Sequence, residues 1–335
     1  MSFRSVRATT ALAGSLALAL TLTACGGSDD DTAAAGQAPS SATPVTVQAG
    51  FIPVIDVAAL YLGDAQGFFT DHGIDLNINT GQGGAALVPP VVSGEYQFAF
   101  SNMVSVLAAR AQGLPLQIIA SGSSSTGEDG KDVSMIRVPA DSPIQSAADL
   151  AGKKVSVNTL NNLLQMLGDV AVDADGGKPD DVQYVELPFP DAVTALQNGD
   201  IDAMVTAEPF DSIAADTGAR VIASPYLDMS DSPLTTSVYF SSEQQLQKDP
   251  ELFKAIVAAI NESLEYAQGH PDEVRAQLSS FTQIDPAVIQ KVTLPTFDPA
   301  IPKDSVQTFI DTAKKFGIVD GDVSYDDLVW SGAGN

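Results

Sequence analysis

From residue 45 onward, short runs rich in β-branched and aromatic residues alternate with longer stretches whose apolar residues recur at helical spacing. VTVQAGF, DLNINTG and YQFAFSN have the composition of strands, whereas MVSVLAARAQG has the spacing of a helix. This alternation is typical of parallel βαβ units, so the sequence predicts an α/β fold. Pro89 and Pro90 interrupt one helical stretch and predict a kink or a restart there, because proline removes a backbone donor.

A loop rich in Gly, Ser and Asp, residues 122–132, ends this first set of elements. A second set begins with SMIRV and continues through KVSVN, VQYVEL and IDAMVT. After TTSVYFSS the chain turns mostly helical, and such helices need a sheet to cover. A chain of this length also exceeds the usual size of a single core, which favours two lobes. The predicted boundaries are 45–133 with 236–335 for lobe 1, 134–235 for lobe 2, and 133–138 with 234–241 for a two-stranded hinge.

The N-terminal segment, residues 1–24, has the pattern of an export signal, because two arginines precede an apolar run too short to span a membrane. The motif LTACG at residues 22–26 resembles a bacterial lipobox. The resemblance implies cleavage before Cys25, lipid attachment to its sulfur, and a position on the extracytoplasmic face of the cell membrane. Ordinary signal cleavage that leaves a free Cys25 thiol is the alternative. Residues 25–44 are rich in Gly, Ser, Asp and Pro and predict a flexible tether.

The composition excludes several classes of function. The chain has 42 acidic and 16 basic residues, for a formal charge of -26, and such a surface repels phosphate backbones. We therefore expect no nucleic-acid partner. Cys25 is the only cysteine, which excludes an intramolecular disulfide and a thiolate metal site. His72 and His270 lie in polar contexts without a nucleophile or metal-ligand spacing, so we expect no catalytic residue, no metal and no cofactor.

Several segments together resemble one known family. They are GFIPVIDVAALYLGDAQGFFTDHGIDL (50–76), the segment from GQGGAAL to LQIIA (81–120), ADLAGKKVSVN and LQNGDIDAMVTAEPF. Their order and spacing, over roughly residues 45–316, resemble the periplasmic-binding-protein family that serves importers for sulfonates, nitrate, taurine and thiamine-pyrimidine-like compounds. The resemblance implies a two-lobed type II fold with a ligand cleft between the lobes, and ABC permease and ATPase subunits as partners. We expect a monomer.

The resemblance also implies that the solute contacts the loop after the first strand, loops that open helices, and an acidic-Pro motif in lobe 2. Glycines there let backbone N–H groups approach a ligand, and helix openings present unpaired donors. Alternatively, the polar residues only cap helices. Glu208 could pair with a ligand amine, accept a hydroxyl proton, or hold the hinge through backbone donors. The candidate ligand-binding residues are Phe51, Ile52, Gly83, Gly84, Ser101, Asn102, Asn158, Thr159, Asn161 and Glu208.

These features lead us to expect an extracytoplasmic solute-binding lipoprotein of an ABC importer. The expected solute is a small organic anion, a sulfonate or an aromatic carboxylate, captured by hinge closure. A pyrimidine or thiamine-precursor-like solute held by Glu208 is the alternative, since Ala207 stands where many relatives carry a basic or aromatic residue. Arg137 is the nearest candidate cation. A pyrimidine-synthase-like enzyme is not expected, because relatives with that activity use a cysteine-rich segment. A scaffold or sensor lipoprotein remains open.

Overall fold

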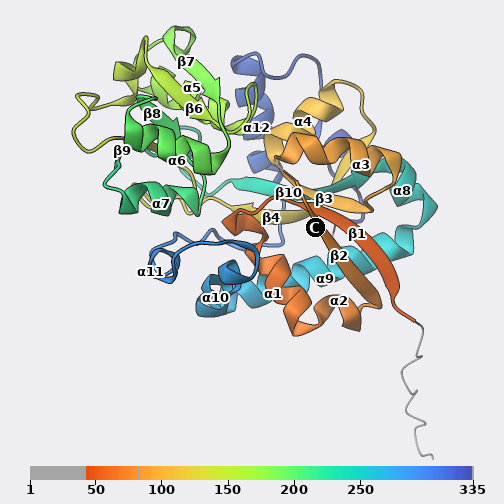
Figure 1. Ribbon diagram of the computed structural model, residues 1–335. Coiled ribbons are helices and arrows are strands. Elements are labelled where there is room, and N and C mark those ends of the chain that lie inside the picture. The colour runs from red at the N-terminus through yellow and green to blue at the C-terminus, as the bar shows by residue number, and fades with distance from the viewer. Residues whose placement is uncertain (1–42, 82, 334–335) are drawn as a thin grey trace, which may run out of the picture. The chain divides into compact units, whose positions relative to one another are not determined.

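The first of two sheets is mixed and has five strands in the order β2-β1-β3-β10-β4 (Figure 1). The computed structural model describes residues 43–81 and 83–333. β1 pairs in parallel with β2 and β3, whereas β10 lies antiparallel between β3 and β4. The strands are β1 (Val45–Phe51), β2 (Ile74–Thr80), β3 (Phe98–Asn102), β4 (Leu116–Ser124) and β10 (Thr235–Ser242).

The second sheet is formed by a continuous part of the chain and has the strand order β7-β6-β8-β5-β9. β6 pairs in parallel with β7 and β8, and β5 runs antiparallel to β8 and β9. In Figure 1 this sheet is coloured yellow-green to green. The strands are β5 (Ile136–Val138), β6 (Lys154–Val157), β7 (Gln183–Glu186), β8 (Ala203–Val205) and β9 (Arg220–Ala223).

Helices connect the strands and cover the sheets. The α-helices are α1 (Ala58–Gln66), α2 (Phe68–Asp71), α3 (Val88–Ser93), α4 (Met103–Ala111), α5 (Leu163–Ala174), α6 (Phe189–Asn198), α7 (Phe210–Asp216), α8 (Glu243–Lys248), α9 (Pro250–Gly269), α10 (Pro271–Phe281), α11 (Pro286–Ile289), α12 (Lys303–Lys315) and α13 (Tyr325–Leu328). The 3-10 turns are η1 (Ile55–Val57), η2 (Gly84–Leu87), η3 (Ala147–Leu150) and η4 (Pro179–Asp181). The long helix α9 packs on α1 and β4, so it covers the first sheet.

The two prolines mark a restart of the helix, as the sequence predicts. A 3-10 turn ends at Leu87, and α3 begins at Val88 with Pro89 and Pro90 in its first turn. Proline is tolerated there because its missing N–H would have no partner inside the helix. The α-helix therefore starts where the prolines stand, and no kink inside a longer helix is needed.

The chain passes between the two sheets at residues 125–135 and 224–234. β5 and β10 belong to different sheets and do not pair with each other. Half of the predicted hinge segment 133–138 lies within β5, and all of 234–241 except its first residue lies within β10. The predicted lobe boundaries stay predictions.

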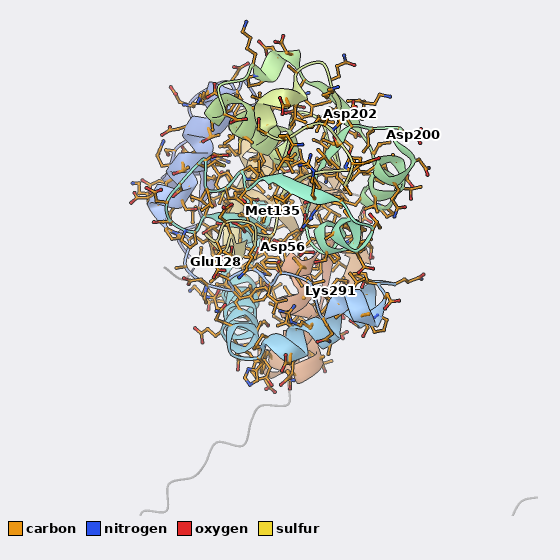
Figure 2. The ribbon with its side chains drawn as sticks, turned by 90° about the vertical axis from the view of Figure 1, so that its left-hand side faces the viewer. Asp56, Glu128, Met135, Asp200, Asp202 and Lys291 are labelled. Atoms are coloured by element: carbon orange, nitrogen blue, oxygen red, sulfur yellow. The ribbon has the colours of Figure 1, made fainter. Side chains whose placement is uncertain are left out.

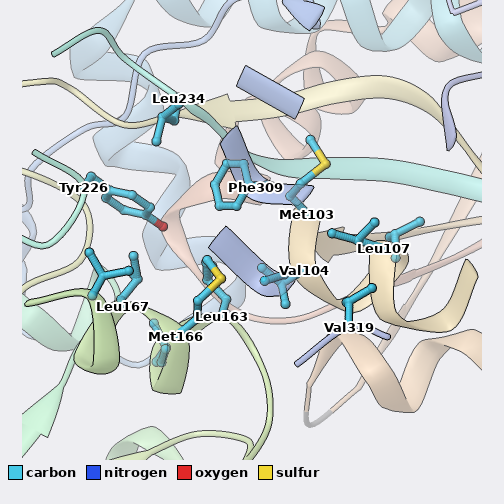
Figure 3. Close-up of a cluster of buried hydrophobic side chains, with 14 of the residues drawn as sticks. Met103, Val104, Leu107, Leu163, Met166, Leu167, Tyr226, Leu234, Phe309 and Val319 are labelled. Atoms are coloured by element: carbon cyan, nitrogen blue, oxygen red, sulfur yellow. The ribbon is translucent and has the colours of Figure 1, made fainter. Parts of the chain in front are cut away.

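One cluster of buried apolar side chains extends from helices of the first sheet to helices of the second (Figure 3). It includes Met103 and Val104 of α4, Leu163 and Met166 of α5, and Phe309 of α12. Burial of such side chains contributes roughly 1.5–3 kcal/mol each. Apolar packing therefore joins the two sheets in addition to the chain crossings.

Within residues 43–81 and 83–333, we find no helix with the length and apolar character that a membrane crossing requires. The predicted export signal, the predicted lipid site at Cys25 and nearly all of the predicted tether lie outside the described residues.

Candidate functional site

A cavity lies at the carboxyl ends of strands from both sheets, where open α/β sheets bind ligands. Ile52 follows β1, Asn102 ends β3, Asn158 follows β6 and Ala207 lies just after β8. The volume of the cavity that the centres of water molecules can reach is about 50 Å³. Measured in the same way, one water molecule needs roughly 10–15 Å³. The cavity therefore has room for a small solute. The other lining residues are Val54, Asp56, Phe100, Val133, Ser134, Leu163, Leu164, Phe189, Tyr226, Thr236 and Ser237.

Asp56, labelled in Figure 2, is the one charged side chain among the described residues that line this cavity. It lies in η1, a few residues after the end of β1, between the buried side chains of Ile55 and Val57. Ser123 Oγ donates to Asp56 Oδ1 at 2.5 Å, and the hydroxyl oxygens of Ser123 and Ser237 are 2.8 Å apart. Burial raises the pKa of Asp56, although hydrogen bonds from Ser123 and Ser237 partly offset the rise. A half-buried carboxyl group thus lies at the cavity, and no Lys, Arg or His is among the described residues that line it.

A second carboxyl group, on Asp132, adds to the negative potential at this place. Asp132 is 1% exposed, and its Oδ1 accepts from the N–H groups of Thr126 at 2.9 Å and Val133 at 2.7 Å. Its Oδ2 has no hydrogen-bond partner among the described residues. Burial raises the pKa of Asp132, and the charge of Asp132 in turn raises the pKa of Asp56. The two carboxyl groups therefore interact electrostatically.

Apolar side chains form another part of the cavity wall. Leu163 and Leu164 come from the first turn of α5, and Phe189 comes from the start of α6. The ring of Phe189 stacks on Phe210, with the ring centroids 4.9 Å apart and the planes at 9°. The cavity thus combines a carboxyl and hydroxyl group on the side of the first sheet with apolar side chains from the second.

Three of the predicted ligand-binding residues line the cavity, namely Ile52, Asn102 and Asn158. Asn102 is also the N-cap of α4, where its Oδ1 accepts from the Ser105 N–H at 2.8 Å. Its capping role and its place at the cavity are therefore compatible, because the Nδ2 group is not used by the cap.

Four other predicted residues lie beside the cavity in two pairs. Gly84 packs so closely on Ser101 that a Cβ at Gly84 would lie 2.0 Å from Ser101 Oγ. Ser101 is fully buried, and its Oγ has no hydrogen-bond partner among the described residues. A Cβ at Gly83 would lie 3.5 Å from Thr159 Oγ1, so loops that follow strands of the two sheets meet there.

Phe51 and Asn161 do not line the cavity. The Phe51 ring lies in the core, with its centroid 5.9 Å from those of Phe98 and Tyr239. Asn161 is exposed with a φ of 51°, and its N–H donates to Gln165 Oε1 at 2.9 Å.

Glu208 is fully buried outside the cavity lining and ties chain segments together. Its Oε1 accepts from Ser212 Oγ and from the Thr293 N–H, both at 2.8 Å. Its backbone carbonyl accepts from the Ile55 N–H at 3.1 Å. Burial, and then the charge of Asp211, raises the pKa of Glu208 to about 7. Glu208 thereby connects α7 to η1 and to the loop after α11.

Arg137 also lies outside the cavity lining, in a buried ion pair. Its Nε and one terminal nitrogen donate to the two carboxylate oxygens of Asp211, each at 2.6 Å. A further nitrogen donates to the carbonyl of Ala219 at 3.0 Å. These contacts occupy the guanidinium group that was the nearest candidate cation for a solute.

Sequence reasoning did not single out Asp56, Ser123, Ser237 or Tyr226. A signal existed for Asp56, because it is the only polar residue in FIPVIDVAAL, directly after a predicted strand. The serines carried no such signal: Ser237 lines the cavity and Ser123 contacts Asp56, and they come from strands that pair only in the folded chain. No group of three or more His, Cys, Asp or Glu side chains in the described part of the chain is placed to hold a metal ion.

Comparison with known proteins identifies the family. The family model described as NMT1/THI5 like matches residues 54–274. The chain therefore belongs to the NMT1/THI5-like family, and the predicted family resemblance is confirmed. One similar curated protein is the nitrate import ATP-binding protein NrtC of Synechocystis, which is 24% identical over 241 residues. The match covers 66% of this chain, but this chain spans only 35% of the length of NrtC.

Solved structures show the same fold. The alkanesulfonate-binding protein SsuA from Xanthomonas axonopodis pv. citri, bound to MOPS, superposes with a TM-score of 0.72 at 19% identity, over 87% of this chain and 99% of SsuA. The CA3427 gene product of Candida albicans, described as having the generic periplasmic binding protein fold, gives 0.65 at 16% identity, over 83% and 92% of the two chains. The predicted α/β periplasmic-binding-protein fold is confirmed.

Proposed function

We propose that this chain is the solute-binding component of an ABC importer. In this proposal a lipid on Cys25 holds it at the extracytoplasmic face of the cell membrane, and it works as a monomer with permease and ATPase subunits. The observation that carries the proposal is the cavity whose lining comes from both sheets. A cavity shared by two sheets can open and close when one sheet moves relative to the other.

The names of two similar proteins support an anionic solute. SsuA is named for alkanesulfonates and NrtC for nitrate import, which supports a small organic anion such as a sulfonate or an aromatic carboxylate. Asn102 and Asn158 are the uncharged donors at the cavity for such an anion. SsuA is also named as a binding protein, which supports a role in binding and not in catalysis.

A second solute class is favoured by Asp56. A carboxylate accepts hydrogen bonds, so it suits a neutral or cationic solute that carries donors, such as a pyrimidine-like thiamine precursor. The carboxyl group that accepts from such a solute is then that of Asp56, which lines the cavity, and not that of Glu208, which does not.

A thermal-shift screen of the purified protein against sulfonates, aromatic acids, nitrate, pyrimidines and amines tests the binding role. A solute that binds only the folded state stabilises it by RT ln(1 + [L]/Kd), about 2.7 kcal/mol at a hundredfold excess over Kd. We expect at least one class to raise the melting temperature. A scaffold lipoprotein would show no shift with any of them.

The lipid anchor is tested separately by fractionation of cells that express Cys25→Ser. The substitution removes the only thiol in the chain, so the protein should move from the membrane fraction to the soluble fraction. Ser28→Ala in the same segment is the matched control and should stay with the membrane. Retention of the Cys25→Ser protein on the membrane would contradict the anchor.

A further inference from the structure

Within the described part of the chain, no cationic side chain of the cavity lining balances the charge of Asp56. No Lys, Arg or His is present among the described residues that line the cavity. All four arginines of the described chain bind groups elsewhere. Arg110 pairs with Glu243, Arg137 pairs with Asp211, Arg220 donates to the carbonyls of Ser142 and Ile144, and Arg275 donates to the carbonyl of Val292.

Asp56 retains the capacity to accept further hydrogen bonds. A carboxylate has two oxygens with about four acceptor positions. Ser123 donates to Oδ1, and Ser123 and Ser237 are themselves joined at 2.8 Å, so these hydroxyls hold the carboxyl group in place. A carboxylate withdrawn from water without a counter-charge is costly, whereas a paired one with good hydrogen bonds is not. The cavity therefore favours a ligand that supplies positive charge and N–H donors.

An anion at the same position would meet repulsion. Its negative group would lie in a cavity that already contains Asp56, with the buried carboxyl group of Asp132 close enough to raise the pKa of Asp56. Asp132 itself does not line the cavity, but it directly precedes Val133, which does, so its buried carboxyl group adds negative charge next to the cavity. Like charges in a poorly solvated cavity repel more strongly than in water.

The apolar side chains that line the cavity indicate the chemistry of the uncharged part of the ligand. Leu163 and Leu164 are buried on the side of the cavity that belongs to the second sheet. Phe189 is half-buried there, and its ring stacks on Phe210. Apolar or aromatic groups gain free energy when they pack against such side chains. A ligand that fits both ends is therefore charged at one end and apolar at the other.

We infer that the solute carries an ammonium or amidinium group that pairs with Asp56, and an apolar or aromatic body that packs against Leu163 and Phe189. The inference rests on the proposed function, since it names the solute class of that same cavity. This solute class differs from the sulfonates and nitrate for which relatives are named. The difference arises because the inference depends on the side chains of this cavity and not on the fold.

The test compares small probes that share a benzene ring and differ in head group. The purified protein is titrated calorimetrically and melted with benzylamine, benzamidine, benzyl alcohol, benzoate and benzenesulfonate. We expect benzylamine or benzamidine to bind at least 10-fold more tightly than the other three. Tighter binding of benzoate or benzenesulfonate overturns the inference and leaves the importer role standing. Binding of none of the five overturns the inference, and failure of every solute class in the wider screen overturns the importer role as well.

Two variants locate the interaction. Asp56→Asn keeps the size of the side chain and removes its charge, so the affinity for the amine should fall about 10- to 100-fold. Asp64→Asn on α1 is the matched control, because Asp64 is also partly buried with a raised pKa but does not line the cavity. Equal loss in both variants, or none in Asp56→Asn, overturns the assignment. If Asp56→Asn does not fold, the ranking of probes with the unchanged protein decides alone.

Discussion

Ser105 of α4 and Asn162 at the start of α5 bind each other between the layers of the two sheets. Asn162 Nδ2 donates to Ser105 Oγ at 2.9 Å, and both side chains are buried. Asn162 Oδ1 also accepts from the N–H of Leu163 at 2.7 Å, so one side chain both caps α5 and contacts α4. Because Leu163 lines the cavity, this contact lies next to the candidate solute site.

Ser105→Ala should weaken solute binding about fivefold. The hydrogen bond to Asn162 forms only when α4 and α5 are together, and a buried hydrogen bond contributes about 1 kcal/mol net. Isothermal titration with the solute found by the screen measures the change. Ser93→Ala is the control, because Ser93 is exposed and donates only to the carbonyl of Pro90. Equal affinities for the two variants would show that this contact does not support the bound conformation.

Glu208→Gln should remove a dependence of stability on pH between about 4.5 and 7. The pKa of Glu208 is raised from 4.5 to about 7, so in this window the folded state binds a proton that the unfolded state lacks. The free energy of unfolding therefore has this contribution in full below pH 4.5 and loses it as the pH rises to 7, by at most roughly 1.4 kcal/mol per pH unit.

Chemical denaturation across that pH range measures the effect of Glu208. The unchanged protein should lose more stability with rising pH than Glu208→Gln does, and Glu95→Gln, an exposed control, should behave like the unchanged protein. The same slope in all three proteins would mean that Glu208 keeps its ordinary pKa.

Arg137→Ala should destabilise the fold by about 3–5 kcal/mol, because it leaves the Asp211 carboxylate buried without its partner. Removal of both partners in Arg137→Ala with Asp211→Ala should restore part of that loss. Denaturant melts give the free energies. Lys254→Ala, which breaks the exposed pair with Glu251, should cost under about 1 kcal/mol. A similar small cost for Arg137→Ala would contradict a structural role for the buried pair.

Gly84→Ala should destabilise the protein by about 1–3 kcal/mol, because the added Cβ would lie 2.0 Å from Ser101 Oγ. Ser101→Ala alone should have little effect, since that hydroxyl has no hydrogen-bond partner in the described chain. The double variant should recover part of the loss, because removal of Oγ leaves the longer contacts with the Ser101 Cβ at 3.0 Å and Cα at 3.3 Å. Gly269→Ala, with nothing within 4 Å, is the control. Equal melting temperatures for Gly84→Ala and Gly269→Ala would contradict the close packing.

Local patterns predicted the elements but not the way in which the first sheet is completed. VTVQAGF forms β1 over the predicted residues, because alternation and β-branched content act within the segment. The place of β10 between β3 and β4 follows from pairs such as Ser237 with Asn102. Such pairs leave no local pattern in the sequence, since the partners are far apart along the chain.

The candidate site shows the same division. Ile52, Asn102 and Asn158 could be predicted because the family resemblance implies solute contacts from the loop after the first strand and from loops that open helices. Phe51 precedes Ile52 by one residue and lies in the core, because successive side chains of a strand point to opposite sides. Asp56 was missed because only the folded chain shows that this single polar residue of an apolar run meets Ser123 at the cavity.

The insertion of β10 in the first sheet has a consequence for how the chain acquires its structure. β5 to β9 follow one another without interruption, so the second sheet can form as soon as residue 223 is available. β3 and β4, by contrast, each have one unpaired edge until β10, residues 235–242, inserts between them. Unpaired strand edges of this kind can pair with other chains. A chain that ends before β10 should therefore aggregate, even though every other strand of both sheets is present.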